Sequence, residues 1–247
     1  MLDREYEIMY RLENNHWWFV AKKRYIKTIL DLHLKDKGVN ILDVGCGTGG
    51  MIDLLKTYGR VFGMDLHAAA CEFSRQRNNF SLIQGDANKL PFKKGTFHLI
   101  TLLDVLYHQY ISDDEEVLEQ VHQLLVPNGL LLITDSAFEF LKSSHDMAVM
   151  ARHRYTLREL TDKLKNHHFS IERSTYLYFI IFPLVVLSRL LGKLTWLFFK
   201  PDIRSDLKET NEYLNRFLTV LLGWEGKLLK RVNFPFGSSL LILGKKT

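Results

Sequence analysis

Three aspartates and a run of glycines are the residues of this 247-residue chain whose types and spacing could do chemistry. The segment 41–50 reads ILDVGCGTGG, so an apolar run ends with Asp43 and is followed closely by Gly45, Gly47 and Gly50. Glycines let the backbone turn with positive φ and approach a ligand, and a helix that begins there points free N–H groups at the ligand. The segment therefore predicts a site for a nucleotide-type cofactor.

The same glycine spacing satisfies the dinucleotide fingerprint, so the glycines alone leave nicotinamide and flavin cofactors open. Asp43 favours a different ligand, because its charge would face a pyrophosphate that the helix N-terminus should attract. S-adenosylmethionine carries no phosphate and has a cationic sulfonium and ammonium group, so it creates no such conflict. A glycine turn between two packed elements is the alternative without a ligand.

Two further acids follow apolar runs in the order that an adenosine cofactor requires. Asp65 comes directly after the run 60–64, about twenty residues past the glycine turn, where an acid can accept hydrogen bonds from both ribose hydroxyls. Asp86 follows the run 80–84, where it can accept a hydrogen bond from an adenine amino group. Either acid alone could be a solvated residue at a strand end, but together they favour a cofactor site.

The elements that must position these acids alternate between apolar runs and helical patterns. The sequence predicts strands at 39–44, 60–64, 80–84, 97–103, 130–134, from about 169 and at 240–243, and helices at about 51–59, 113–125 and 156–166. This alternation is typical of βαβ units with a mainly parallel sheet and helices on both faces. We expect an α/β core over residues 39–175, completed by a final strand at 237–247 and preceded by an N-terminal helical cap at 1–38.

Residues 176–236 break the alternation and predict a hydrophobic helical insertion before the last strand. Its apolar run at 176–187 is about a dozen residues long, whereas a membrane span needs roughly twenty. One helix face would carry the stripe Leu184, Leu187, Leu191, Leu194 and Phe198. We expect this stripe to pack in the core, and a helix lying on a membrane surface through 176–200 is the alternative. A second pattern at 214–228 could pair with the first.

The composition is that of an ordinary globular protein with a slightly basic balance. There are 33 basic and 28 acidic residues. This small excess of positive charge mildly favours phosphates, nucleic acid or an anionic membrane as binding partners. Two cysteines, Cys46 and Cys71, exclude a disulfide scaffold and lack zinc-site spacing. Residues 1–11 are charged and helix-like rather than a secretory leader, so we expect a cytoplasmic protein.

The chain resembles the class I S-adenosylmethionine-dependent methyltransferases, most closely the type 11 group, over residues 16 to about 175 and the last strand. The motifs that carry the resemblance lie at 41–49, 61–65, 85–87, 90–92, 97–108 and 124–129. The segments His16-Trp17-Trp18-Phe19 and Arg154-Tyr155-Thr156 resemble one subgroup of that family. The resemblance implies a Rossmann-like sheet of seven strands with an antiparallel last strand, and S-adenosyl-L-methionine as cofactor.

The resemblance also assigns expected roles to single residues. Those around the methionyl part are Asp43, Gly45, Cys46 and Gly47. Asp65 and Leu66 are expected at the ribose, Asp86 and Ala87 at the adenine, and Leu103 along the wall of the site. Trp17 is expected to close over the cofactor, or else to dock the N-terminal helix.

Methyl transfer from a sulfonium is a direct displacement, so positioning the acceptor suffices and neither a metal nor a covalent residue is required. His108, just beyond the strand 97–103, could remove a proton from the acceptor, or could orient it or cap the next helix.

The chain lacks an Asn-Pro-Pro-Tyr element after that strand and a Pro-Cys nucleophile, which disfavours nucleic acid as the methyl acceptor. We expect a small-molecule or apolar, lipid-linked acceptor, with the insertion as a wall of its pocket. A catalytically silent cofactor- or partner-binding module and a nicotinamide-dependent oxidoreductase remain the alternatives.

Overall fold

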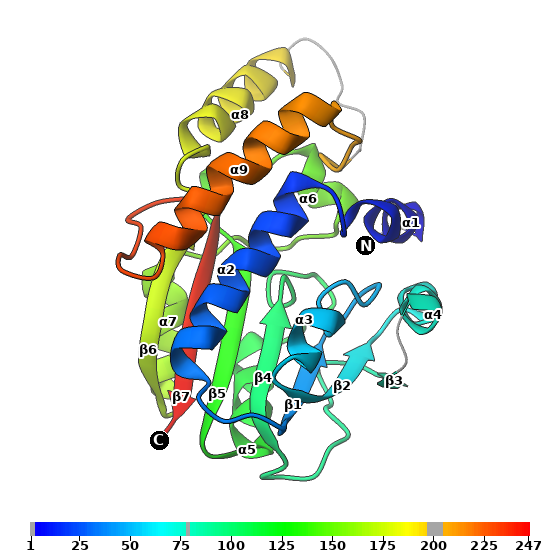
Figure 1. Cartoon of the computed structure of the whole chain (residues 1–247), viewed down its shortest axis with the longest axis vertical. Coiled ribbons are helices and arrows are strands. Elements are labelled where there is room, and N and C mark those ends of the chain that lie inside the picture. Colours follow the sequence, from blue (N-terminus) through cyan, green and yellow to red (C-terminus); the bar gives the residue numbers. More distant parts are fainter. Residues whose placement is uncertain (1–2, 78–79, 197–204) are drawn as a thin grey trace.

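The computed structural model describes residues 3–77, 80–196 and 205–247 of the chain. Its centre is a seven-stranded sheet in the order β3-β2-β1-β4-β5-β7-β6 (Figure 1). Among the described strands, β7 alone runs in the direction opposite to the others. The strands are β1 (Val39–Val44), β2 (Gly59–Asp65), β3 (Ser81–Gln84), β4 (Phe97–Leu103), β5 (Leu125–Ser136), β6 (Phe169–Leu177) and β7 (Ser239–Lys246). The predicted α/β fold with an antiparallel last strand is confirmed.

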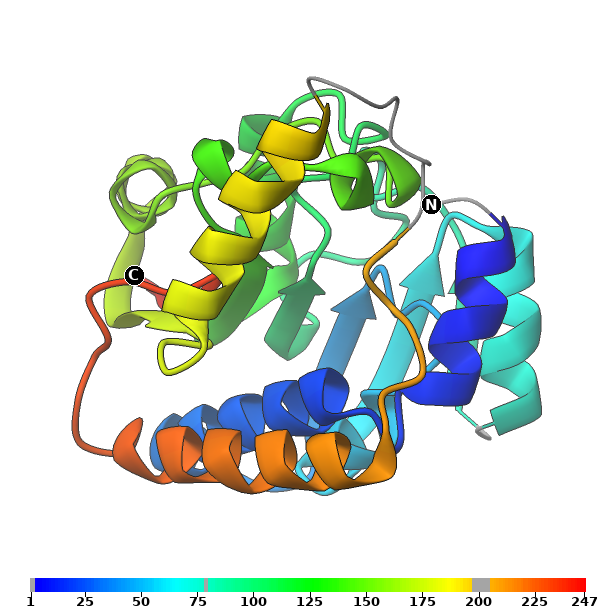
Figure 2. The same cartoon turned by 90° about the horizontal axis from the view of Figure 1, so that it is seen from above.

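Helices cover both faces of this sheet (Figure 2). The described helices are α1 (Asp3–Leu12), α2 (Trp17–His33), α3 (Ile52–Lys56), α4 (Ala68–Arg77), α5 (Asp114–Leu124), α6 (Ser144–Ala148), α7 (Leu157–Asn166), α8 (Phe182–Trp196) and α9 (Glu212–Leu228). Side chains alternate across each strand, so Leu42 and Val44 pack with α5 and α7, while Val39 and Ile41 pack with α2, α3 and α9. Two apolar layers therefore hold the sheet in place.

The strand β5 begins earlier than the sequence predicts. The segment Pro127-Asn128-Gly129, which precedes the predicted strand 130–134, lies inside β5 as a bulge. Asn128 takes a φ of 62°, and the pairing with β4 shifts from Phe97↔Leu125 to Leu99↔Leu130. A bulge inserts extra residues without ending the ladder, which is why turn-type residues here do not end the strand.

The insertion forms α8 and α9 between β6 and β7, and the stripe on α8 is not in the core as we expected. Leu184, Leu187 and Leu191 are 67%, 53% and 54% exposed. In Figure 1, α8 lies beyond the ends of the strands. The sheet therefore offers no face there to cover these leucines. Phe198, which was expected on the same stripe, lies outside the described residues, and the side chain of Leu194 is likewise not described.

The second helix of the insertion, α9, packs along α2 and does not pair with α8 as the sequence suggested (Figures 1 and 2). Leu222 is fully buried in the same apolar layer as Tyr25 and Ile29 of α2, and Leu218 and Leu221 pack against that layer. The helix pair thus fixes the insertion to the N-terminal segment. Within the described part of the chain, no helix has both the length and the hydropathy needed to cross a bilayer.

Candidate active site

One cavity of about 670 Å³ opens at the carboxyl ends of β1, β2 and β4. Parallel strands bring their carboxyl ends to one edge of the sheet, where ligands of α/β folds bind. All eleven residues that the sequence proposes for the site line this cavity: Trp17, Asp43, Gly45, Cys46, Gly47, Asp65, Leu66, Asp86, Ala87, Leu103 and His108.

The glycine turn between β1 and α3 requires residues without a Cβ atom. Gly45 and Gly47 have φ angles of +71° and +55°, which side chains rarely adopt. A Cβ on Gly45 would also lie 2.5 Å from Cγ2 of Val105, and one on Gly47 would lie 2.9 Å from Cε of Met9. The turn therefore presents bare backbone to the cavity.

Asp43 supplies a buried carboxyl group beside this turn. It is 1% exposed, and Oγ1 of Thr101 donates a hydrogen bond to it at 2.6 Å. Burial raises the pKa of Asp43 to about 7, because the charged carboxylate loses its hydration. A cationic ligand group in the cavity would favour the ionised form.

Asp65 and Asp86 end the neighbouring strands with different surroundings. The backbone amides of Gly47 and His67 donate to the two carboxylate oxygens of Asp65, at 2.8 and 2.9 Å, and burial raises the pKa of this group. Asp86 is exposed and accepts from the backbone and side-chain amides of Asn88 through Oδ1. A carboxylate can accept about four hydrogen bonds and each of these accepts two, so both acids retain capacity for ligand hydroxyl or amino groups.

The N-terminal helix α1 covers the glycine turn. The sequence did not predict this contact. Tyr6, Met9 and Glu13 line the cavity. Oγ1 of Thr48 and the guanidinium of Arg77 both contact Oε1 of the buried Glu13 carboxylate, at 2.5 and 2.9 Å. No local pattern marks these residues, because their role arises only when α1 folds over the turn.

The His16-Trp17-Trp18 segment joins the cavity to the insertion. Nε2 of His16 lies 3.0 Å from Oγ1 of Thr210, and the backbone amide of Trp17 donates to Oδ1 of Asn215 at 2.8 Å. Trp18 stacks on Tyr178 with ring centroids 3.7 Å apart. The segment thus lines the cavity and helps to dock α2, and the closure of Trp17 over a bound cofactor stays a prediction.

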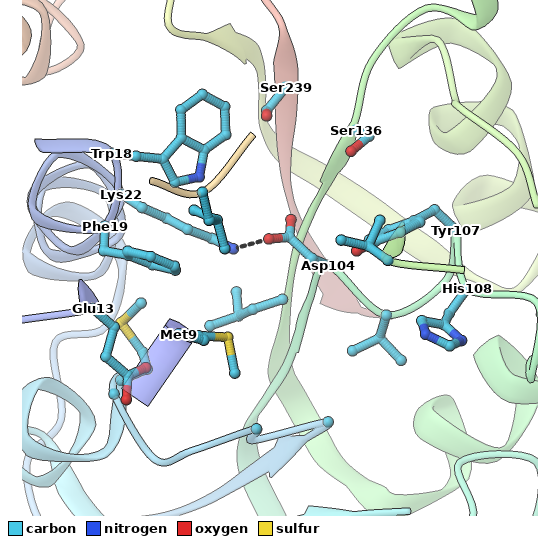
Figure 3. Close-up of a pocket in the computed structure, with 18 of the residues that line it drawn as sticks. Met9, Glu13, Trp18, Phe19, Lys22, Asp104, Tyr107, His108, Ser136 and Ser239 are labelled. Atoms are coloured by element: carbon cyan, nitrogen blue, oxygen red, sulfur yellow. Dashed lines mark hydrogen bonds and ion pairs between the residues drawn. The ribbon is translucent and has the colours of Figure 1, made fainter. Parts of the chain in front are cut away.

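A salt bridge between Lys22 and Asp104 crosses the middle of the cavity (Figure 3). Asp104 follows β4 directly and has a φ of 60°, which is strained for a residue with a side chain. Its backbone amide donates to the carbonyl of Thr134 at 2.8 Å. Sequence reasoning missed this carboxylate, because positive φ at a non-glycine residue has no reliable sequence signal.

His108 points into the cavity further along the same loop (Figure 3). Burial lowers the pKa of His108 to about 4, so the imidazole is neutral near pH 7. A neutral imidazole can accept a proton, although such a low pKa gives little driving force for doing so.

The Arg154-Tyr155-Thr156 segment holds the far wall of the cavity. Arg154 forms two hydrogen bonds with the buried carboxylate of Asp146, at 2.6 and 3.1 Å. Thr156 caps the start of α7 together with Glu159. These contacts give the segment a structural role.

Apolar side chains of the insertion close the other end of the cavity. Ile181, Leu184 and Val185 line it from α8 and the segment just before it, and Leu218 lines it from α9. The cavity therefore runs from the glycine turn to the insertion, where these apolar side chains share the wall with the ion pair of Arg189 and Asp206.

Comparisons with known proteins agree with this geometry. Residues 42–133 match the family described as a methyltransferase domain. A 2-phytyl-1,4-naphtoquinone methyltransferase of Thermosynechococcus vestitus is 36% identical over 107 residues, which cover 40% of this chain and 47% of the relative. A demethylmenaquinone methyltransferase of Listeria welshimeri is 29% identical over 129 residues, which cover 48% of this chain and 54% of the relative. The chain thus spans about half the length of the curated relatives it matches.

A solved structure extends the likeness to nearly the whole chain. The methyltransferase in complex with the Haloferax volcanii Trm112 methyltransferase activator superimposes with a TM-score of 0.62 and 18% identity. The superposition covers 98% of this chain and 93% of that one, so the insertion is included in the shared fold. Part of the chain thus matches a methyltransferase domain, and nearly the whole chain shares the fold of that structure.

The cavity fits S-adenosylmethionine, the cofactor that the sequence motifs favour. A cationic methionyl part would satisfy the buried carboxyl group of Asp43, and the bare turn at Gly45 and Gly47 leaves room for it. Asp65 retains acceptor capacity for ribose hydroxyls, and Asp86 does so for an adenine amino group.

Proposed function

We propose that this methyltransferase transfers the methyl group of S-adenosylmethionine to a small apolar or lipid-linked acceptor. The observation that carries the proposal is the continuity of one cavity from Asp65 and Asp86 to the apolar wall at Leu184 and Val185. An acceptor at the apolar end would meet the methyl donor in the middle of the cavity. The quinone methyltransferases among the curated relatives support an acceptor of this kind.

The bound cofactor supplies an electrophilic methyl group on sulfur. The residues of the chain then have to hold the acceptor in line with that methyl and to exclude water. We assign Asp104 the role of accepting a hydrogen bond from the O–H or N–H of the acceptor, because its carboxylate lies in the middle of the cavity (Figure 3). Lys22 holds this carboxylate in place. His108, the residue first predicted for proton removal, stays the alternative.

Two substitutions on different faces of α8 test the position of the acceptor. Val185 lines the cavity, whereas Val186 lies in an outer apolar groove of the same helix. We expect Val185→Trp to raise the acceptor KM or lower kcat/KM at least tenfold while the Kd of S-adenosylmethionine changes by less than about twofold, since a bulky ring would fill the apolar end. Val186→Trp is the control and should leave both values near wild type. Equal effects of the two substitutions would contradict an acceptor at the insertion.

A further inference from the structure

The outer face of α9 carries a stripe of exposed apolar side chains. Tyr213, Phe217, Val220, Trp224 and Leu228 are 85%, 61%, 54%, 66% and 53% exposed. At 100° per residue they fall within about 80° of one another, and they extend over about 22 Å of helix. This is the face opposite Leu222, which packs on α2. Folding of the described chain therefore leaves one whole side of an apolar helix uncovered.

Basic side chains border this stripe. Arg216 and Lys227 lie on one flank of α9, and Lys230 and Arg231 follow its end, all of them exposed. The acid Glu225, by contrast, is fully buried and accepts a hydrogen bond from the backbone amide of Ile180 at 3.0 Å. The exposed acid Glu212 lies in the first turn of α9, so four exposed basic residues and one exposed acidic residue accompany the apolar stripe.

The charge of the whole chain is concentrated in the same region. Residues 180–234 contain nine basic and five acidic residues, a net charge of +4 out of the chain's +5. A surface that binds through apolar side chains and positive charge is complementary to anionic phospholipid headgroups above an acyl layer. The aromatic residues of the stripe also favour a membrane surface, since Trp and Tyr prefer the interface between headgroups and acyl chains.

We propose that α9 docks this protein on the surface of an anionic membrane, with the stripe Tyr213, Phe217, Val220, Trp224 and Leu228 entering the acyl boundary. The helix lies in the plane of the interface and its flanking basic residues contact headgroup phosphates. Helix α8, which lies apart from α9 in Figure 2, exposes leucines as well and lines the cavity.

This membrane assignment goes beyond the proposed function, and it is tested without methyl transfer. The full-length protein is mixed with vesicles of phosphatidylcholine containing about 30% phosphatidylglycerol, or with vesicles of phosphatidylcholine alone, and bound protein is measured by flotation. We expect wild type to float with the anionic vesicles and Phe217→Ser/Trp224→Ser to bind at least tenfold more weakly. The pair Arg216→Gln/Lys227→Gln should weaken binding several-fold and remove the preference for anionic vesicles.

The control is Ile83→Ser, which removes an exposed apolar side chain from β3 and should bind like wild type. Circular dichroism and S-adenosylmethionine binding confirm that each variant is folded. The proposal is overturned if wild type does not float with anionic vesicles, or if the Phe217/Trp224 variant floats equally well. It is also overturned if light scattering shows a wild-type dimer that this variant converts to a monomer, because the stripe would then be a protein interface.

Discussion

The backbone amide of Gly47 donates a hydrogen bond to Oδ2 of Asp65, with 2.8 Å between nitrogen and oxygen. The contact joins the glycine turn after β1 to the end of β2, two segments eighteen residues apart in the sequence. The second oxygen of the same carboxylate accepts from the amide of His67. Asp65 therefore orients the turn and the following loop at once, and it remains able to accept from a ligand.

Substitution Asp65→Ala should weaken S-adenosylmethionine binding about 10- to 100-fold. Hydrogen bonds to a charged group contribute about 1.5–3 kcal/mol, and the variant also leaves the Gly47 amide without its acceptor. Isothermal titration calorimetry measures the change. Asp53→Ala, on the exposed side of α3, is the matched control and should bind as wild type does. Unchanged affinity in Asp65→Ala would remove this residue from the cofactor site.

Cofactor binding should strengthen as pH rises towards 7. The free protein holds a proton on Asp43, whose pKa is raised to about 7, and a cationic ligand favours the ionised carboxylate. Binding then releases a proton below pH 7, so the Kd should be about tenfold higher at pH 6 than at pH 8. Asp43→Asn should bind more weakly and lose most of this dependence. A pH-independent wild-type Kd would contradict the role of Asp43.

The raised pKa of Asp43 also determines how the stability of the cofactor-free protein changes with pH. The folded state binds the Asp43 proton more tightly than the unfolded state, so the free energy of unfolding should fall as pH rises from about 4 to about 7. Urea unfolding without cofactor should therefore show Asp43→Asn gaining stability relative to wild type over this range. A difference in the free energy of unfolding between wild type and Asp43→Asn that stays constant from pH 4 to pH 8 would contradict this prediction.

Two substitutions separate the candidate proton acceptors. Asp104→Asn keeps an oxygen for Lys22 but loses the charge, and we expect kcat to fall at least tenfold with little change in S-adenosylmethionine affinity. His108→Asn should lower kcat less than about threefold between pH 6 and 8, since the pKa of His108 is already lowered to about 4. Steady-state rates over this pH range decide between them. A larger loss in His108→Asn than in Asp104→Asn would reverse the assignment.

The packing of α9 on α2 can be tested by stability alone. Leu222 is fully buried against α2, so Leu222→Ala should lower the free energy of unfolding by about 2–5 kcal/mol. Leu214, on the same helix, is half exposed, and Leu214→Ala should cost less than about 1 kcal/mol. Urea unfolding compares the two. Similar losses would mean that α9 is not docked as described.

The sequence predicts those parts of the structure that local chemistry determines. The strands at 39–44 and 97–103 match the observed bounds, because each is a mainly apolar run with turn-forming residues near both ends. The convergence of Asp43, Asp65 and Asp86 on one cavity follows from the rule that parallel strands end at a common edge.

The rest depends on contacts between distant segments. Met9 and Glu13 reach the glycine turn only because α1 folds over it, and nothing in their own neighbourhood indicates this. Asp104 turns into the cavity through a strained φ that most aspartates avoid. The leucines of α8 have a helical period, but the period of a stripe does not reveal whether anything covers it.

Methyl transfer itself is tested most directly with S-adenosylmethionine labelled on the methyl group. The full chain is incubated with the labelled cofactor and a total cell extract, and the products are divided into lipid, nucleic acid, protein and aqueous fractions. We predict label in an apolar small-molecule or lipid fraction, with an equal amount of S-adenosylhomocysteine, and at least tenfold less with Asp65→Ala at limiting cofactor. Absence of S-adenosylhomocysteine above background would contradict methyl transfer, and label confined to nucleic acid or protein would contradict the apolar acceptor.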